Sequence, residues 1–229
     1  MTLTKSKAVY LSISSLMVIV GILFSGPVGL IITRTFGGQS TWEGAEVFAG
    51  NYSAIEALPF AFGFLLILGF MFFFSCLIGA GKEGQQPLEV MGVVLAGIFG
   101  SLVCLNYTIQ VAYIPILVDE NASILAFLAM TNPASLPWAI EMFGYCILGI
   151  ATVFAAPLFS NRGLQAIIRW LLVLNGVLSV GGAVMFTVNS AETVSGFGIV
   201  GYVFWNALIV VIMLLVIIEF RFGRRSKAS

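Results

Sequence analysis

Six apolar runs dominate this chain, and basic residues collect in every second gap between them. The runs cover residues 8–33, 54–80, 88–117, 136–159, 164–189 and 196–219. The hydrocarbon core of a bilayer is about 30 Å thick, which roughly 20 apolar residues in a helix can cross. Each run is therefore predicted to form one transmembrane helix. The first run, of about 25 residues, also exceeds the apolar core of a signal peptide, so we interpret it as a span that is not cleaved.

The charged residues predict the orientation of these spans. When the gaps are numbered alternately inside and outside, Arg34 is the one basic residue left in an outer gap. The other basic residues lie in inner gaps or near the inner end of a span: Lys5, Lys7, Lys82, Arg162, Arg169, Arg221, Arg224, Arg225 and Lys227. The outer gaps hold the acids Glu43, Glu46, Asp119, Glu120 and Glu192. Because basic residues favour the cytoplasmic side, both termini are predicted to be cytoplasmic.

The composition predicts a single transmembrane domain covering residues 1–229. Hydrophobic residues make up 60% of the chain, charged residues 9%, and the mean hydropathy is +1.09. Soluble domains carry about 25% charged residues, which excludes a water-solvated fold. We therefore expect an all-α polytopic membrane protein whose partner is the lipid bilayer. No long basic run suggests a nucleic acid, and the sequence does not predict an oligomeric state.

Several kinds of chemistry are excluded by missing residue types. The chain has no histidine, which removes His-based zinc sites and nucleophile–histidine pairs. Its cysteines, Cys76, Cys104 and Cys146, fall in three different spans and form no CxxC motif. We therefore predict no metal and no cofactor. We also expect the protein not to be an enzyme, because Glu141 alone remains as a candidate acid or base. A retinal protein is also excluded, since it needs a seventh span and a lysine in mid-membrane.

The two longest outer gaps each contain a short apolar segment. In the first gap, Ser40 to Glu43 fits a capping box that opens a short helix holding Trp42 and Phe48. Such a helix is expected to lie on the membrane surface. In the second gap, the segment from Ile124 to Met130 is too short to cross the bilayer. The inner turns are tight, so the more elaborate face is predicted to be outside.

Polar side chains inside the spans are the candidate functional residues, because lipid makes unpaired polar groups costly. Asn106, Gln110 and Tyr113 are spaced at i, i+4 and i+7, which places them on one face of an α-helix. The fourth and sixth spans each add a pair at i and i+4. The predicted ligand-binding residues are Asn106, Gln110, Tyr113, Glu141, Tyr145, Tyr202 and Asn206. Together they would form a polar pocket in the outer half of the bundle.

The alternative for the same residues is a purely structural role in joining helices and forming an aromatic belt. Amide side chains also join neighbouring membrane helices at about 0.6 kcal/mol per contact. Tyrosines near the outer surface are also typical of an aromatic belt. Arg169 is expected to extend toward the inner surface, with a pairing to Glu89 as the alternative. Gly97, Gly100, Gly176, Gly181 and Gly182 are expected to allow close helix contacts.

These observations lead to two main hypotheses about function. The first is a protein that binds or transports a small molecule entering from outside, with amides and phenols as hydrogen-bonding groups. Glu141 would then offset a cation or accept a proton. The alternative is a non-catalytic membrane partner, assembly protein or sensor that interacts through its outer loops.

One region of the chain also resembles a known group of sequences. The segments are LPWAIEMFGYCILGIATVFAAPLF (136–159), the following NRG, and IIRWLLVLNGVLSVGGAV (167–184). Residues 136–184 resemble an uncharacterised bacterial family of six-span membrane proteins, known as a domain of unknown function. The resemblance implies a prokaryotic cell membrane, where the protein would lie in the inner membrane. It implies no particular activity.

Overall fold

The computed structural model describes residues 1, 3–37, 41–120 and 122–222. Six of its helices are long and apolar enough to cross a membrane, with the bounds Lys5–Gly37, Ala54–Leu77, Gln86–Glu120, Leu136–Leu158, Gly163–Val188 and Gly196–Arg221. The predicted all-α, six-span architecture is confirmed, and every predicted run matches its helix to within a few residues. The chain is therefore an integral membrane protein that crosses the bilayer several times.

The spans are assembled from shorter elements. The first contains α1 (Lys5–Ser25), α2 (Pro27–Ile32) and the π turn η1 (Thr33–Gly37), and the second contains η2 (Ala54–Ala57) and α4 (Leu58–Leu77). The third contains α5 (Gln86–Thr108), the π turn η3 (Ile109–Tyr113) and α6 (Ile114–Glu120). The others are α8 (Leu136–Ala155) with η4 (Ala156–Leu158), α9 (Gly163–Val188), and α10 (Gly196–Ile217) with η6 (Ile218–Phe222). Between spans lie α3 (Ala45–Asn51), α7 (Ala122–Leu128) and η5 (Ser190–Val194).

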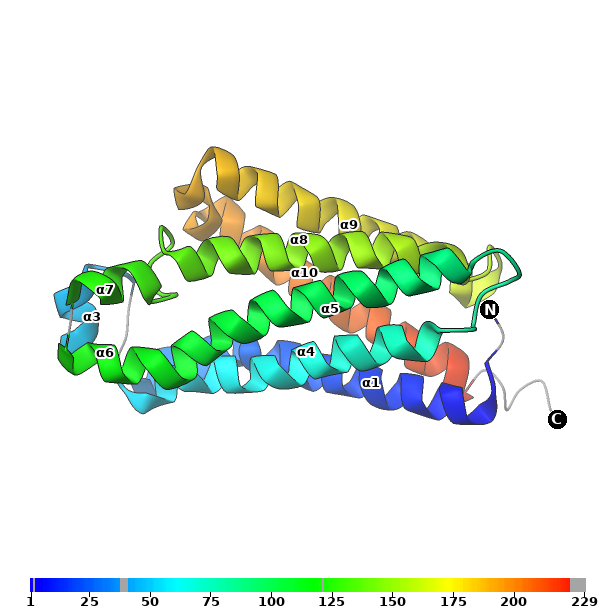
Figure 1. The fold of residues 1–229 in the computed structure, drawn as a ribbon, viewed down its shortest axis with the longest axis horizontal. Coiled ribbons are helices and arrows are strands. Elements are labelled where there is room, and N and C mark those ends of the chain that lie inside the picture. The colour runs from blue at the N-terminus through cyan, green and yellow to red at the C-terminus, as the bar shows by residue number, and fades with distance from the viewer. Residues whose placement is uncertain (2, 38–40, 121, 223–229) are drawn as a thin grey trace.

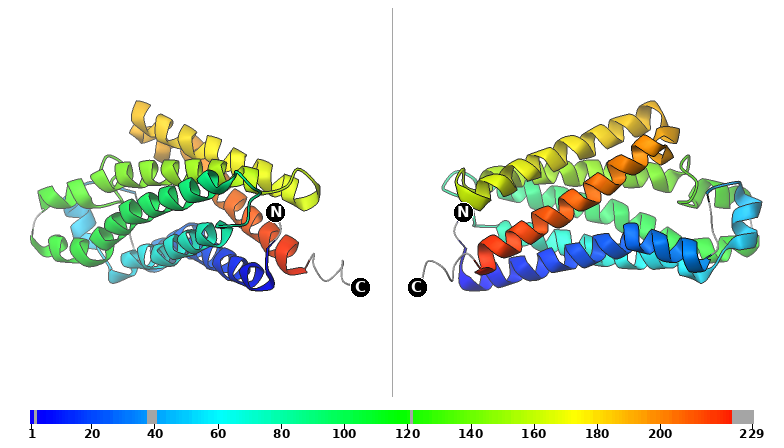
Figure 2. Two further views of the ribbon diagram at one scale, coloured as in Figure 1. Left: turned by 45° about the vertical axis from the view of Figure 1, so that its right-hand side comes forward. Right: turned by 180° about the vertical axis from the view of Figure 1, so that it is seen from behind.

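The six long helices form a closed ring in chain order. α1 packs against α4, α4 against α5, α5 against α8, α8 against α9, and α9 against α10. The ring closes where α10 and η6 pack against α1, as the rear view in Figure 2 shows. The start of α1 therefore lies at the same end of the bundle as the end of η6 (Figure 1). This arrangement follows from an even number of spans joined by short connections.

The bundle packs apolar side chains between its helices and also carries large apolar side chains on its outer surface. Phe70, Phe73, Phe74 and Phe99 are fully buried between the helices. Large apolar side chains also cover the outer surface of the spans, among them Leu68, Val94, Ile98, Val177 and Val203. An apolar surface of this extent suits lipid, which solvates hydrocarbon and leaves backbone hydrogen bonds to the helices themselves.

Close helix contacts occur at some of the expected glycines and not at others. A Cβ atom at Gly100 would lie 2.9 Å from the sulfur of Met71, and one at Gly176 would lie 2.8 Å from the carbonyl oxygen of Gly149. The expectation was wrong for Gly97, Gly181 and Gly182, which have no neighbouring atom within 4 Å of that position. The tightest approach of two backbones is one the sequence analysis did not single out. A Cβ at Gly21 of α1 would lie 2.5 Å from the backbone nitrogen of Leu66 in α4.

One end of the bundle carries a small extra layer made of α3, α6 and α7, which we call the cap (Figure 1). The third span has 35 residues. At about 1.5 Å per residue it is roughly 50 Å long, so α6 extends past a hydrocarbon core of about 30 Å. The cap has its own apolar core, formed by Phe48, Ile114, Leu117, Leu125 and Ala129.

The cap gives packing partners to the first short segment, whose expected place on the membrane surface stays a prediction. α3 packs against α7 and α6. Helices of seven residues are too short to be stable alone, so α3 and α7 bury their apolar sides against each other and against α6. The predicted capping box includes Ser40, which lies outside the described residues. α3 itself starts at Ala45. The preceding residue, Gly44, has a φ of 124°, a backbone conformation that glycine adopts more easily than other residues.

The opposite end of the bundle is closed by tight turns. Both carboxylate oxygens of Glu89 accept hydrogen bonds from the turn between α4 and α5, from the backbone nitrogens of Gly79 and Gly81, at 2.7 Å each. Arg169 donates to the side-chain oxygen of Asn161 at 2.6 Å. The alternative pairing of Arg169 with Glu89 is therefore not formed, because the turn already occupies that carboxylate.

The predicted orientation can be tested with two cysteine substitutions, Ala191→Cys at the cap end and Asn161→Cys at the opposite end. Both positions are exposed. If the distribution of basic residues sets the topology, an impermeant thiol reagent labels position 191 in intact cells and position 161 only after the membrane is opened. The unsubstituted protein provides the control for the native cysteines. Labelling of position 161 in intact cells would contradict the predicted orientation.

Candidate functional site

Glu141 occupies a buried position near the cap end of α8. The helix begins at Leu136 after Ser135, which has an extended backbone, and Pro137 fits its first turn as predicted. Glu141 then lies between α8 and α5, with only 9% of its surface exposed. Its oxygen Oε2 accepts a hydrogen bond from Nδ2 of Asn106 at 2.6 Å, and Oε1 accepts one from the hydroxyl of Tyr107 at 3.0 Å. Two neighbouring residues of α5 thus hold one carboxyl group of α8.

Further hydrogen bonds extend this arrangement along α5 and toward the cap. The hydroxyls of Tyr107 and Tyr145 are 3.2 Å apart. Nε2 of Gln110 donates to the carbonyl oxygen of Leu128 at 2.9 Å, and Oε1 of Gln110 accepts from the backbone nitrogen of Met130 at 3.0 Å. Gln110 therefore fastens the end of α7 to η3, the turn that follows α5. We call Asn106, Tyr107, Gln110, Glu141 and Tyr145 the Glu141 cluster.

Aromatic rings surround the Glu141 cluster. The ring of Tyr107 lies 5.6 Å from Phe60 and 6.1 Å from Phe64, measured between centroids. Tyr145 lies 5.3 Å from Phe99 and 4.9 Å from Trp205 of α10. These distances are typical of aromatic pairs, so four helices (α4, α5, α8 and α10) contribute to one site.

Tyr113 lies apart from the cluster, although its spacing predicted the same helix face. It is 45% exposed. The physical reason is the π turn η3, where the backbone nitrogen of Ile114 bonds to the carbonyl of Ile109, five residues earlier. The wider turn moves the following residues around the helix axis, so the i, i+7 relation fails. Pro115, which has no N–H to donate, follows this turn and is the sequence signal that could have predicted it.

Tyr202 and Asn206 form a second polar group on α10. They face Gly26, where the first span is interrupted before Pro27. A Cβ at Gly26 would lie 2.7 Å from Oδ1 of Asn206 and 2.9 Å from the hydroxyl of Tyr202. Trp205 connects α10 to the cluster through Tyr145 and to α9 through Nε1, which donates to Ser179 at 3.1 Å. The predicted residues thus fall into two neighbouring groups rather than one.

Tyr107 and Trp205 are central to this site, although neither was among the predicted binding residues. Tyr107 directly follows Asn106 in the sequence. A buried carboxyl group has two oxygens to satisfy, and the phenol next to Asn106 is a donor at the same depth. That requirement could have identified Tyr107 from the sequence.

Some buried polar atoms among the described residues have no hydrogen-bond partner in the protein. Apart from Oδ1 of Asn175, they belong to residues near the cap end: Tyr52, Glu56, Ser135 and Trp138. Burial, and then the nearby Glu56 carboxyl group, raises the pKa of Tyr52. Buried polar atoms are nearly always paired, so these atoms at the cap end are exceptions to the general pattern.

Comparison of the chain with models of protein families, with curated proteins and with solved structures gave no match.

The substitution Tyr107→Phe tests how much the cluster contributes to stability. It removes the hydroxyl that bonds Glu141 and Tyr145 and keeps the ring contacts with Phe60 and Phe64. We expect a loss of about 1 kcal/mol in the free energy of unfolding, seen as a lower midpoint in thermal unfolding of the purified protein in detergent. Tyr10→Phe is the control, since Tyr10 is half exposed on the outer face of α1. Equal effects of the two substitutions would mean that the cluster adds no stability.

Proposed function

We propose that the protein binds a small cation at Glu141 and carries it across the membrane. The observation that supports this most is the environment of the carboxyl group. Glu141 is buried in a membrane span, and among the described residues its polar partners are the uncharged donors of Asn106 and Tyr107. An acidic residue within a span is expensive to keep and most often serves function.

The lack of a nearby cation strengthens this proposal. A buried carboxylate is normally paired with an arginine or lysine. Within the described residues, Lys82, Arg162 and Arg169 lie at the opposite end of the bundle, where they line a common cavity, and Arg34, the basic residue of η1 at the cap end, is exposed. A ligand cation would supply the missing charge, and the rings of Tyr107, Tyr145 and Trp205 would favour an organic cation through their π faces.

The described conformation is a closed one, because the cluster satisfies its own hydrogen bonds. A ligand would have to replace the bonds that Asn106 and Tyr107 make to Glu141. The chain has two irregular points close to the site where movement could occur: the break at Gly26 between α1 and α2, and the π turn η3 directly after α5. Interrupted helices and π turns recur at the binding sites of membrane transporters and at other functional sites.

Binding is tested by thermal unfolding of the purified protein with a panel of inorganic and organic cations. A ligand that binds only the folded protein raises its stability, by about 2.7 kcal/mol at a concentration 100 times its Kd. We expect at least one cation to raise the midpoint of the wild type and to leave that of Glu141→Gln unchanged. Glu192→Gln is the matched control, because Glu192 is an exposed acid at the same end of the bundle.

Two results of this experiment would contradict the proposal. One is a panel in which no cation stabilises the wild type. The other is equal stabilisation of the wild type and Glu141→Gln. If a cation does bind, its uptake into vesicles that contain the wild type, and its loss with Glu141→Gln, would separate transport from binding alone.

A second candidate function is assembly with a partner protein through the cap. Its support is the apolar surface there: Phe127 of α7 is 58% exposed and Ile116 of α6 is 52% exposed. Phe48, which lies in the first outer gap, is buried in the core of the cap and offers no surface to a partner. We expect Phe127→Ser to abolish recovery of a stoichiometric partner from solubilised membranes without lowering the unfolding midpoint. Leu68→Ser, on the outer face of α4, is the control, and unchanged recovery with Phe127→Ser would remove this candidate.

A further inference from the structure

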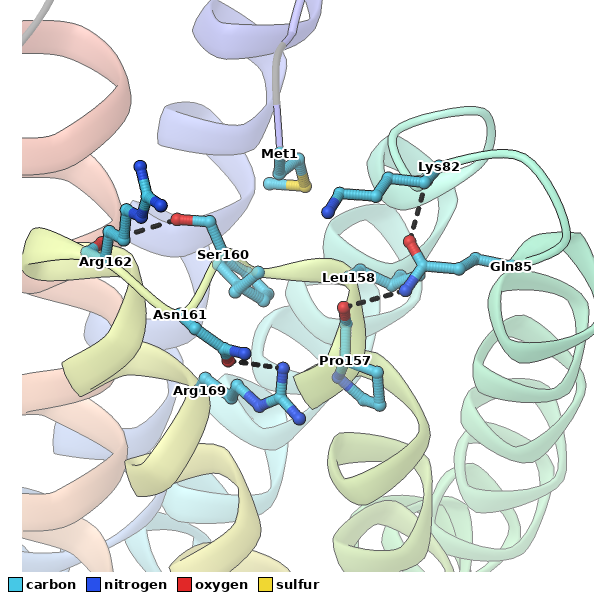
Figure 3. Close-up of a pocket in the computed structure, with 10 residues that line it drawn as sticks. Met1, Lys82, Gln85, Pro157, Leu158, Ser160, Asn161, Arg162 and Arg169 are labelled. Carbon is cyan, nitrogen blue, oxygen red and sulfur yellow. Dashed lines mark hydrogen bonds between the residues drawn. The ribbon is translucent and has the colours of Figure 1, made fainter.

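A cavity of about 510 Å³ lies at the end of the bundle opposite the cap. Its walls are the turn between α4 and α5, the connection from η4 to α9, and the N-terminal residue (Figure 3). Three basic side chains line it. Lys82 comes from the connection between α4 and α5, Arg162 from the connection between η4 and α9, and Arg169 from α9 near its N-terminus. The positive-inside pattern predicts all three at this end of the bundle, but it does not predict that they line one cavity, and the proposed function does not use them.

Hydrogen bonds hold the walls of this cavity in place. Nε2 of Gln85 donates to the carbonyl oxygen of Pro157 at 3.0 Å, and Oε1 of Gln85 accepts from the backbone nitrogen of Lys82 at 2.7 Å (Figure 3). Gln85 thus ties the two turns together. Arg169 is positioned by its bond to Asn161 at 2.6 Å. The cavity is therefore bounded by a fixed frame, with the three cations attached to it.

No acidic side chain is among the residues that line the cavity. Glu89 accepts hydrogen bonds from the backbone nitrogens of Gly79 and Gly81, and Glu219 accepts one from Gln165 at 2.9 Å, so neither carboxylate bonds a basic side chain of the cavity. Glu83 is exposed in the turn and is not among the lining residues. Burial and then the charge of Lys82 lower the pKa of the amine of Met1, while the charge of Glu219 raises it.

Two helices also begin at this cavity without a side-chain cap. They are α5, which follows Gln85 and carries the acidic Glu89 in its first turn, and α9, which follows Arg162 and has no acid in its first turn, so α9 is the one that favours an anion. The free N–H groups of a first helical turn carry partial positive charge and add to the attraction for an anion.

We infer that this cavity binds a phosphate group. Its turns join the ends of membrane spans, which is the depth at which lipid headgroups lie, and basic pockets between spans are suited to anionic headgroups. Arginine binds phosphate oxygens through two parallel hydrogen bonds, and lysine contributes a point charge. The same chemistry would hold the headgroup of an anionic phospholipid or a free phosphate compound.

Native mass spectrometry of the purified protein in a non-ionic detergent tests this inference. The probes are phosphatidylglycerol, phosphatidylcholine with the same acyl chains, and inorganic phosphate. We expect phosphatidylglycerol to bind at least about tenfold more tightly than phosphatidylcholine, which corresponds to about 1.4 kcal/mol. The variant Lys82→Gln/Arg162→Gln should lose that preference. Lys5→Gln is the control, because Lys5 is an exposed basic residue at the same end but outside the cavity.

The possible outcomes separate the two sources of phosphate. Loss of phosphatidylglycerol binding in the double variant, but not in Lys5→Gln, supports a lipid site. Saturable binding of inorganic phosphate that the double variant loses, without a lipid preference, supports a site for free phosphate compounds. Equal binding of every probe by all three proteins overturns the inference. The unfolding midpoint of each variant verifies folding, and Arg162→Gln alone replaces the double variant if that midpoint falls.

Discussion

The interaction on which the structure most depends is the placement of one carboxyl group between two membrane helices. Glu141 of α8 takes hydrogen bonds from Asn106 and Tyr107 of α5, at 2.6 and 3.0 Å. In lipid no water is available to hydrogen-bond these groups, so the protein has to supply every hydrogen-bond partner. The pairing therefore sets the register of α5 against α8, and through Gln110 it also fixes the cap to the bundle.

The two ends of the bundle have different chemistry. The cap end has a carboxyl group, amides and phenols below a small apolar layer, and it leaves several buried polar atoms unpaired. The opposite end has tight turns, a cavity and three basic side chains. This division suggests a protein that meets a cationic ligand on one side of the membrane and holds an anionic group on the other. The proposals do not depend on each other, since no residue is shared between the two sites.

Much of the fold was predictable because lipid imposes simple rules on a sequence. The six spans follow from apolar length alone, and Asn106, Gln110 and Glu141 were identified because buried polar groups in a membrane require partners. Tyr113 was misplaced, because a π turn changes the register and the spacing rule assumes a regular α-helix. The packing of α3 on α7 and the basic cavity join segments far apart in the chain, which no local pattern reveals. The cytoplasmic termini and the resemblance to a bacterial six-span family stay predictions.

The central claim is that Glu141 is kept in the bundle to bind a ligand rather than only to join two helices. Native mass spectrometry of the wild type and of Glu141→Gln, each released gently from the membrane, tests this most directly. The account predicts that the wild type retains one small cationic molecule that Glu141→Gln lacks, with similar unfolding midpoints for the two proteins. Two proteins that carry no small molecule, together with a lower unfolding midpoint for Glu141→Gln, would show that the carboxyl group serves helix packing alone.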